Sequence, residues 1–367
     1  MGQFHEQQRG RIVSEQPYRS QPDTAFWSRS ISRNYDPDVV GSLAGPLLRD
    51  GDVVVSAGSC FASNVVPWLE AANITYLRTE RPHPMFESLG ENLGYRSFSA
   101  AYGNIYTVRQ MLQLLKRAHG LFTPQEDRWY VDGGVVDPFR PGLRYPASSD
   151  GEFDVLTAEH LSATRSAFRD ASVLVLTLGL TEAWLSAVDG AVYPGAPGTI
   201  SGTFDPTRHV FHNFTADEVR RDLHELIELV RGDNPTVRVI LTVSPVPLVA
   251  TATAEHVLTA STYSKSVLRV AAGEIASSVA DVTYFPAYEI ITGPQAPYDF
   301  MEADRRNVSA AGIRAAMHSL LVNSDISHLE IPGEVGPVAA SPAVEQPGAR
   351  LSRSVVDAEC DEVLAES

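Results

Sequence analysis

The sequence predicts a three-layer α/β/α fold, in which helices cover both faces of a five-stranded, mostly parallel sheet with loop insertions. Short apolar runs rich in Val, Ile and Leu recur along the chain, which is typical of strands buried on both faces. Amphipathic segments separate these runs, so strand and helix alternate, as in parallel sheets. The 367 residues are 44% hydrophobic and 20% charged, a composition usual for globular proteins.

The expected elements follow in chain order. Five apolar runs predict the strands, at residues 52–57, 74–77, 172–178, 237–243 and 282–285. Apolar residues at helical spacing predict helices after residue 60, from about Asn104 to Leu115, and over 158–168, 215–232, 255–278 and 309–321. Thr215-Ala216-Asp217-Glu218 forms a capping box at the start of one of them. Asp189-Gly190 indicates a short hairpin around 188–192.

Three regions are expected outside this alternation or inserted into it. Residues 1–36 form an N-terminal lead that packs on the body, with Phe26 and Trp27 as anchors. Two stretches rich in Pro and Gly, residues 78–99 and 121–154, are predicted to be a long loop and an insertion. The body is therefore expected over 37–323. The acidic tail, 324–367, is predicted to be disordered.

Charge and cysteine content limit the partners and the compartment. The net charge of −16 disfavours nucleic acid as a partner. Only Cys60 and Cys360 are available for a disulfide, which suits a reducing compartment. Residues 1–16 lack the apolar core of a signal peptide, and no run is long enough to span a membrane, so we expect a cytoplasmic location. Scattered histidines and the absence of Gly-rich phosphate loops predict no metal and no cofactor.

The strand ends indicate where a ligand would bind. In a parallel sheet the carboxyl ends of the strands meet at one edge, and ligands bind in the crevice there. The segments expected at this edge are polar or rich in Gly and Pro; they are Gly58–Cys60, Gly179–Glu182, Ser244–Pro247 and Pro286–Glu289. A cysteine at a helix N-terminus is a suitable nucleophile, because the dipole favours the thiolate. Cys60 and Ser59 are therefore candidates.

Residues Gly58-Ser59-Cys60-Phe61-Ala62 spell the motif of the GSCFA family, which the chain resembles from Pro17 to about Leu321. Five further segments support the resemblance: Tyr102–Thr107, Thr177–Trp184, Phe211–Thr215, Val243–Pro247 and Tyr284–Glu289. The GSCFA family looks like a branch of the SGNH (GDSL-like) esterases and acyltransferases. The resemblance implies their flavodoxin-like three-layer fold and an acyl-transfer reaction.

The same resemblance suggests roles for individual residues. Aligned with the Gly-Asp-Ser turn of SGNH enzymes, Gly58-Ser59-Cys60 puts Cys60 at the nucleophile; a shift of one residue makes it Ser59, and a third alternative is that neither acts. Gly103 and Asn104 resemble the oxyanion donors, although they could simply begin a helix. Gly179, Thr181 and Glu182 lie where SGNH enzymes carry Gly-x-Asn-Asp, with Thr181 in place of the amide donor and Glu182 as a substrate-orienting or structural group.

The base is the largest departure from the SGNH pattern. The family's Asp-x-x-His run corresponds here to Asp304-Arg305-Arg306-Asn307, and an Asn side chain is no general base. His256 or His212 could replace the histidine, or Asp304 could act alone. The predicted function is an ester hydrolase or O-acyltransferase acting on a small-molecule or glycan acyl ester or thioester. The alternatives are a glycan- or acyl-binding module without turnover, and a scaffold that acts through its tail. The sequence does not indicate an oligomeric state.

Overall fold

Five parallel strands form the central sheet in a computed structural model that describes residues 16–42, 45–81, 95, 97–141, 143 and 146–333. The strands are β1 (Val53–Gly58), β2 (Thr75–Tyr76), β5 (Val173–Leu178), β9 (Arg238–Val243) and β10 (Val282–Tyr284). They lie in the order β2-β1-β5-β9-β10, and each neighbouring pair is parallel. The predicted three-layer fold is confirmed.

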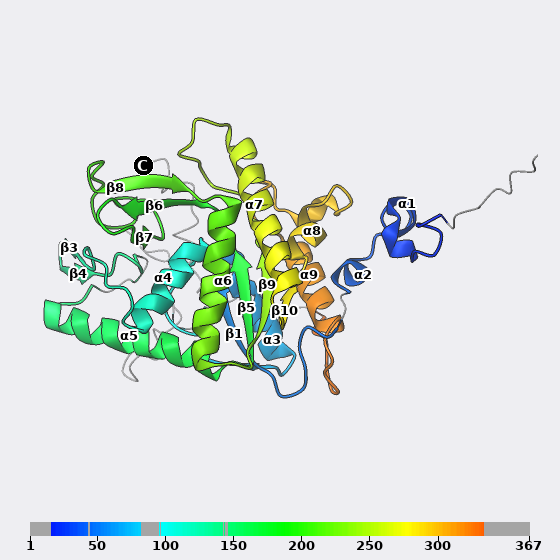
Figure 1. Cartoon of the computed structure of the whole chain (residues 1–367), viewed down its shortest axis with the longest axis horizontal. Helices are drawn as coiled ribbons and strands as arrows, with labels where there is room; N and C mark the ends of the chain where they lie inside the picture. The colour runs from blue at the N-terminus through cyan, green and yellow to red at the C-terminus, as the bar shows by residue number, and fades with distance from the viewer. Residues whose placement is uncertain are drawn as a thin grey trace, which may run out of the picture.

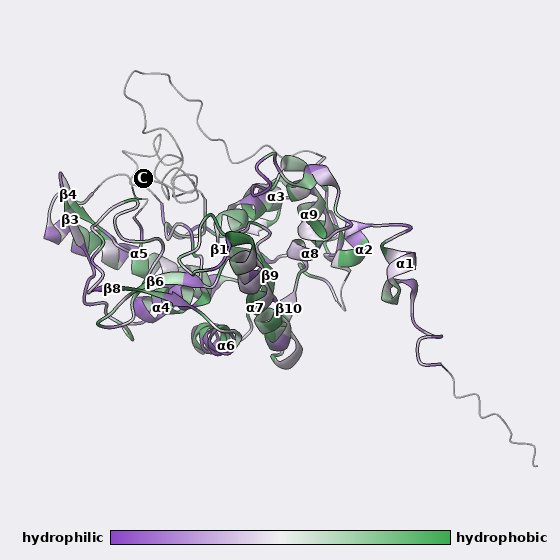
Figure 2. Cartoon of the chain, turned by 90° about the horizontal axis from the view of Figure 1, so that it is seen from above, coloured by the Kyte–Doolittle hydropathy of each residue, from purple (hydrophilic) through white to green (hydrophobic). Residues whose placement is uncertain are grey.

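Helices cover both faces of this sheet (Figures 1 and 2). On one face lie α4 (Val108–Ala118), α5 (Asp150–Asp170), α6 (Ala216–Asp233) and α7 (Val257–Ser278); on the other lie α3 (Val65–Ala71), α8 (Ala287–Thr292) and α9 (Ala310–Val322). Alternate residues of a strand face opposite layers, so Leu174 and Leu176 belong to one core cluster and Val173 and Val175 to the other. Both faces of the sheet are therefore buried.

The strand order places a ligand site by topology alone. Numbered by their order along the chain, the five strands lie as 2-1-3-4-5, the flavodoxin-like order. The direction of winding reverses between β1 and β5, so the chain leaves these two neighbours toward opposite faces of the sheet. A crevice opens at their carboxyl ends, where β1 ends at Gly58 and β5 ends at Leu178.

A second, antiparallel sheet follows β5. It consists of β6 (Glu182–Ser186), β7 (Val192–Tyr193) and β8 (His209–Asn213) in the order β7-β6-β8. The hairpin expected around 188–192 joins β6 to β7, with Gly190 at a φ of +71°. His209 and His212 both belong to β8, which pairs with β6 and which no apolar run in the sequence predicts. The count of five strands in all therefore holds only for the central sheet.

Several element boundaries differ from the expectation. The helix predicted from Asn104 begins only at Val108, because Thr107 caps it and the N–H of Ile105 donates instead to the carbonyl of Gly58. A 3₁₀ helix, η2 (Cys60–Asn64), precedes α3. Helix α5 starts at Asp150, eight residues earlier than predicted, with Ser149 as its cap. The insertion at 121–154 also contains a hairpin of β3 (Trp129–Val131) and β4 (Gly134–Val136).

The ends of the described chain lie at the rim of the body. The lead contains η1 (Asp23–Ala25), α1 (Trp27–Ser30) and α2 (Pro37–Gly41), and α1 projects away from the sheet (Figure 1). Trp27, one of the two expected anchors, is 62% exposed. At the other end Ile326, Leu329 and Ile331 pack on the core cluster that includes α9, and a further 3₁₀ helix, η4, spans Tyr298–Phe300. Most of the predicted 78–99 loop and of the tail, with Cys360, lies outside the described residues.

Candidate active site

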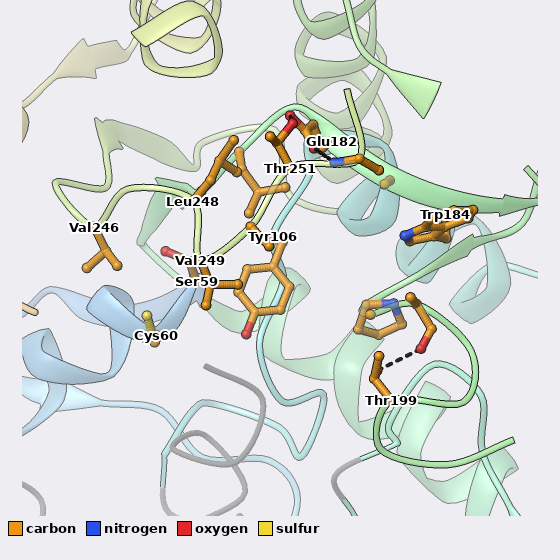
Figure 3. A pocket seen from close by; sticks show the side chains of 18 of the residues that line it. Ser59, Cys60, Tyr106, Glu182, Trp184, Thr199, Val246, Leu248, Val249 and Thr251 are labelled. Atoms are coloured by element: carbon orange, nitrogen blue, oxygen red, sulfur yellow. Dashed lines mark hydrogen bonds between the residues drawn. The ribbon is translucent and has the colours of Figure 1, made fainter. Parts of the chain in front are cut away.

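A cavity of about 380 Å³ lies at the crevice where the winding reverses (Figure 3). Its walls come from the ends of β1, β5 and β9, from the antiparallel sheet and from the loop before α9. Ser59 and Cys60 line it directly after β1, Gly179 and Glu182 after β5, and Ser244 after β9. The expected convergence of strand ends is thus found for three of the four segments, because none of Pro286–Glu289 lines the cavity.

The β1 turn presents both nucleophile candidates to this cavity. Gly58 has a φ of +153°, and a Cβ there would lie 2.3 Å from the carbonyl oxygen of Thr177, so only glycine fits. Ser59 is buried, and among the described residues its hydroxyl has no hydrogen-bond partner. Cys60 is half-buried, and its carbonyl accepts a hydrogen bond from the Ser63 hydroxyl at 2.8 Å. The cavity therefore reaches a thiol and a hydroxyl on adjacent residues.

A lysine that the sequence interpretation did not single out lies beside this turn. Lys265 of α7 is only 4% exposed, and its Nζ donates to the carbonyl of Gly179 at 2.6 Å. Burial lowers the pKa of the Lys265 amine to about 7; attraction to Cys60 offsets part of this effect, and the Arg306 cation adds to it. Lys265, Cys60 and Arg306 thus form one electrostatic group, with an amine that titrates near neutral pH.

The sequence does hold a signal for Lys265. It follows Ser264 on the buried stripe of α7, between Ser261 and Leu268 at helical spacing. A lysine on an otherwise buried stripe is unusual, since lysines are almost never fully buried unless paired. The chain has only two lysines, Lys116 and Lys265, against many arginines, and of the two residue types only lysine loses its proton readily when buried.

Asp304 and Asn307 lie in the loop that brings Arg306 to the cavity. The Asp304 carboxylate accepts from the backbone N–H groups of Arg306 and Asn307 at 2.9 and 3.0 Å, and from the Asn307 amide at 2.6 Å. Between them Arg305 has a φ of +57°, in the left-handed region. Asp304 and Asn307 are exposed and do not line the cavity, whereas Arg306 does.

The two histidine candidates are also held away from the nucleophiles. His256 is exposed at the start of α7, where its Nδ1 accepts from the N–H of Leu258 at 3.1 Å and caps the helix. His212 of β8 bonds to Glu218 at 2.9 Å. Neither is among the residues that line the cavity. Lys265 does not line the cavity either, but it lies behind the wall at Gly179 and interacts electrostatically with Cys60.

Glu182 and Thr181 differ in their placement. Glu182 lines the cavity, and its carboxylate accepts from the Thr251 hydroxyl at 2.7 Å and from the Ala252 N–H at 3.2 Å (Figure 3). It thereby fixes the loop that follows β9. Thr181 is fully buried outside the cavity lining, where its hydroxyl donates to the Asn213 side chain at 2.6 Å and its N–H to the Ser264 hydroxyl at 3.0 Å.

Gly103 and Asn104 lie behind the β1 turn. The hydrogen bond from Ile105 to Gly58 brings this segment against the turn, and Gly103 has a φ of +65°. Asn104 is 1% exposed, and its carbonyl accepts from the Gln110 amide at 3.0 Å. Only Tyr106 of this segment lines the cavity. The two predicted oxyanion donors are thus adjacent to the nucleophiles without contributing to the cavity wall.

The GSCFA family model matches residues 53–320, most of the chain, and the match includes the β1 turn, Lys265 and Arg306. A search of curated proteins found none that match. Among solved structures, one from Streptococcus pneumonia, named provisionally as a platelet activating factor, is 14% identical over 77% of this chain and 87% of its own, with a TM-score of 0.33. A likeness at that level carries no argument about fold or activity. Within the part of the chain that the structure describes, no helix has the length and apolarity to cross a membrane.

Proposed function

The chain belongs to the GSCFA family, and from that premise and the geometry of the cavity we propose that it is an acyl-transfer enzyme, an ester hydrolase or an O-acyltransferase. One observation carries the proposal: Cys60 lines a cavity at the switch point of the sheet, beside a buried lysine whose pKa is about 7. Perturbed titratable groups in a cleft are typical of catalytic sites.

In the proposed first half-reaction, the neutral amine of Lys265 accepts the proton of the Cys60 thiol. The thiolate attacks the acyl carbonyl carbon, a C–S bond forms, and the carbonyl π electrons move to oxygen, near the Arg306 cation. Collapse of this intermediate breaks the bond to the leaving alcohol, which takes the proton back from Lys265. The products are a thioester on Cys60 and a free alcohol.

In the second half-reaction, water or an acceptor hydroxyl attacks the thioester and gives its proton to the Cys60 sulfur by way of Lys265. Water yields a carboxylic acid, and an acceptor hydroxyl yields a new ester; both restore the free thiol. Lys265 thus fills the role that the SGNH pattern gives to the histidine of its Asp-x-x-His run. Asp304 acts indirectly in this scheme, since it shapes the loop that holds Arg306.

Nearby cations, and not the dipole of an α-helix, would stabilise the thiolate form of Cys60. Cys60 is the first residue of the 3₁₀ helix η2, so its sulfur does not lie on the first turn of an α-helix. A neighbouring ammonium or guanidinium favours a thiolate by the same electrostatics. This supports Cys60 over Ser59, since an alcohol remains protonated in the same field.

The test uses p-nitrophenyl acetate and intact-mass spectrometry on wild-type protein and on Cys60→Ala, Ser59→Ala and Cys360→Ala variants. We expect one acetyl group on the wild type and on the Ser59→Ala and Cys360→Ala variants, and none on Cys60→Ala. Cys360→Ala is the matched control for reaction at the other thiol. Loss of the acetyl adduct in the Ser59→Ala variant alone would identify Ser59 as the nucleophile. No adduct on any protein would favour a binding module.

A further inference from the structure

Beyond the nucleophiles, the cavity continues into an arm with mostly apolar walls. In Figure 3 Cys60 and Ser59 lie at one end, Trp184 and Thr199 at the other, and Tyr106 and Leu248 between them. Most of the other lining residues are aromatic or aliphatic, among them Leu180, Ile200, Phe211 and Val249. Trp184 packs edge-on against Phe211 and Phe204, with ring centroids 5.7 and 5.0 Å apart, so the far end of the arm has a firm wall.

Glu182, Thr251 and Thr199, three of the polar side chains along this arm, already bond to the protein. Glu182 accepts from Thr251 and Ala252, and the Thr199 hydroxyl donates to the Ala196 carbonyl at 2.7 Å. A sugar in the arm would exchange hydrogen bonds to water for contacts with rings and methyl groups, which is unfavourable for each unpaired hydroxyl. An apolar group has no such cost. The walls therefore disfavour a glycan in the arm.

We propose that this arm binds the acyl chain of the substrate, so that the enzyme acts on esters or thioesters of unbranched, medium-length fatty acids. The cavity of about 380 Å³ is at the small end of the usual range for ligand pockets, which suits a chain of about eight carbons better than a long one. The carbonyl then lies at Cys60, and the product carboxylate forms beside Arg306. This inference rests on the proposed function for its chemistry but has a separate binding test.

The kinetic test is a series of p-nitrophenyl esters from acetate through butyrate, hexanoate and octanoate to dodecanoate. Each methylene that enters the arm should raise kcat/KM by about two- to four-fold until the arm is full. We expect a maximum near octanoate and a decline at dodecanoate. A flat profile, or a maximum at acetate, would overturn the assignment of the arm to an acyl chain.

Two variants test the arm, one by enlarging it and one by filling it. Trp184→Ala removes the far wall and should shift the maximum to longer chains. Ala250→Phe, made in the exposed loop after β9, should fill the arm and shift the maximum to shorter ones. Trp27→Ala is the matched control, because Trp27 is exposed on α1 and does not line the cavity. If neither cavity variant moves the maximum, the arm is not the acyl site.

Calorimetry with the Cys60→Ala variant, which lacks the proposed nucleophile, measures binding to the arm separately from the reaction. Sodium octanoate should bind at least ten-fold more tightly than butyrate, adding Trp184→Ala should weaken it, and N-acetylglucosamine should not bind. Equal binding of octanoate and butyrate, or binding of the sugar, would overturn the proposal even if p-nitrophenyl acetate acylates Cys60. If no ester acylates Cys60 while octanoate binds through Trp184, the acyl site stands and the proposed reaction fails.

Discussion

Lys265 places an ionisable amine where packing alone would favour an apolar side chain. Its pKa is about 7 in the folded protein and near 10.5 when exposed, because burial disfavours the ammonium. Below pH 7 the folded state must hold a buried cation, and between pH 7 and 10.5 only the unfolded state keeps the proton. Stability therefore rises with pH across that window. Retaining such a residue makes sense if its amine is needed in the reaction.

Replacing Lys265 by Met should raise stability while abolishing acyl transfer. Met fills a similar volume without a charge, so the gain in unfolding free energy should be about 1–4 kcal/mol at pH 6 and smaller at pH 9, where part of the wild-type penalty has gone. The acetylation rate of Cys60 should fall at least 100-fold. Thermal melting at both pH values and stopped-flow acetylation measure the two effects.

Lys116→Met is the matched control, since Lys116 is the other lysine of the chain and pairs with Glu225 on the surface. It should change neither the acetylation rate nor the pH dependence of melting. An unchanged acetylation rate in Lys265→Met would show that Lys265 does not handle the Cys60 proton.

Elements with a strong local signal were predictable, and elements that depend on distant partners were not. The capping box of Thr215 and Glu218 is present in the structure, and β5 and β9 follow apolar runs. Strand β8 has two histidines and no apolar run, and it forms because β6 offers it hydrogen-bonding partners. Helix α4 starts late because the preceding residues bond to the β1 turn, a contact no sequence pattern announces.

The insertion between α4 and α5 is tied to the body through a buried charged cluster. Glu80 accepts from His160 at 2.7 Å and from the Ala101 N–H at 2.7 Å, and Arg140 lies 3.6 Å from it and bonds to Asp137. Burial raises the pKa of Glu80, but its interactions with His160, Arg140 and Ala101 outweigh burial and lower the pKa to about 2. The pKa of His160 is lowered, chiefly by burial, so its neutral ring donates to Glu80.

Glu80→Gln should therefore lower the free energy of unfolding much more at neutral pH than in acid. Because the folded pKa of Glu80 lies below the unfolded value of 4.5, its contribution is present above pH 4.5 and is lost as the pH falls toward 2. We expect a loss of about 3 kcal/mol in unfolding free energy at pH 7 and a much smaller one at pH 3, measured by urea unfolding. Glu255→Gln, at an exposed position, is the control. A deficit that is equal at the two pH values would contradict this account.

At the scale of the whole molecule, the place of the site was predictable and its full set of residues was not. Alternating strands and helices are enough to bring Cys60 and Gly179 to one edge. Lys265 and Arg306 arrive from α7 and from the loop before α9, and their approach depends on how those segments pack. Asp304 and His256 were singled out by register and by position along the chain, neither of which determines where a side chain points.

Gly179 directly follows β5 and lies against the β1 turn, so its substitution tests the assembled site. A Cβ there would lie 2.8 Å from the Tyr106 carbonyl oxygen and 3.0 Å from the Ser59 Cβ, so the segment before α4 and the β1 turn could not stay as close to Gly179 as they are. Gly179→Ala should cost about 1–3 kcal/mol of stability. It should also slow Cys60 acetylation more than ten-fold, because the Gly179 carbonyl holds Lys265.

Gly232→Ala provides the comparison, since nothing lies within 4 Å of a Cβ at that position in α6. At that position the change to alanine should leave the acetylation rate unaltered. It should raise the free energy of unfolding by about 0.5–1 kcal/mol, because alanine is the better helix former. Calorimetric melting and acetylation rates on both variants decide the matter. If Gly179→Ala reacts as fast as Gly232→Ala, the close approach of Gly179 to the β1 turn does not position Cys60 against Lys265.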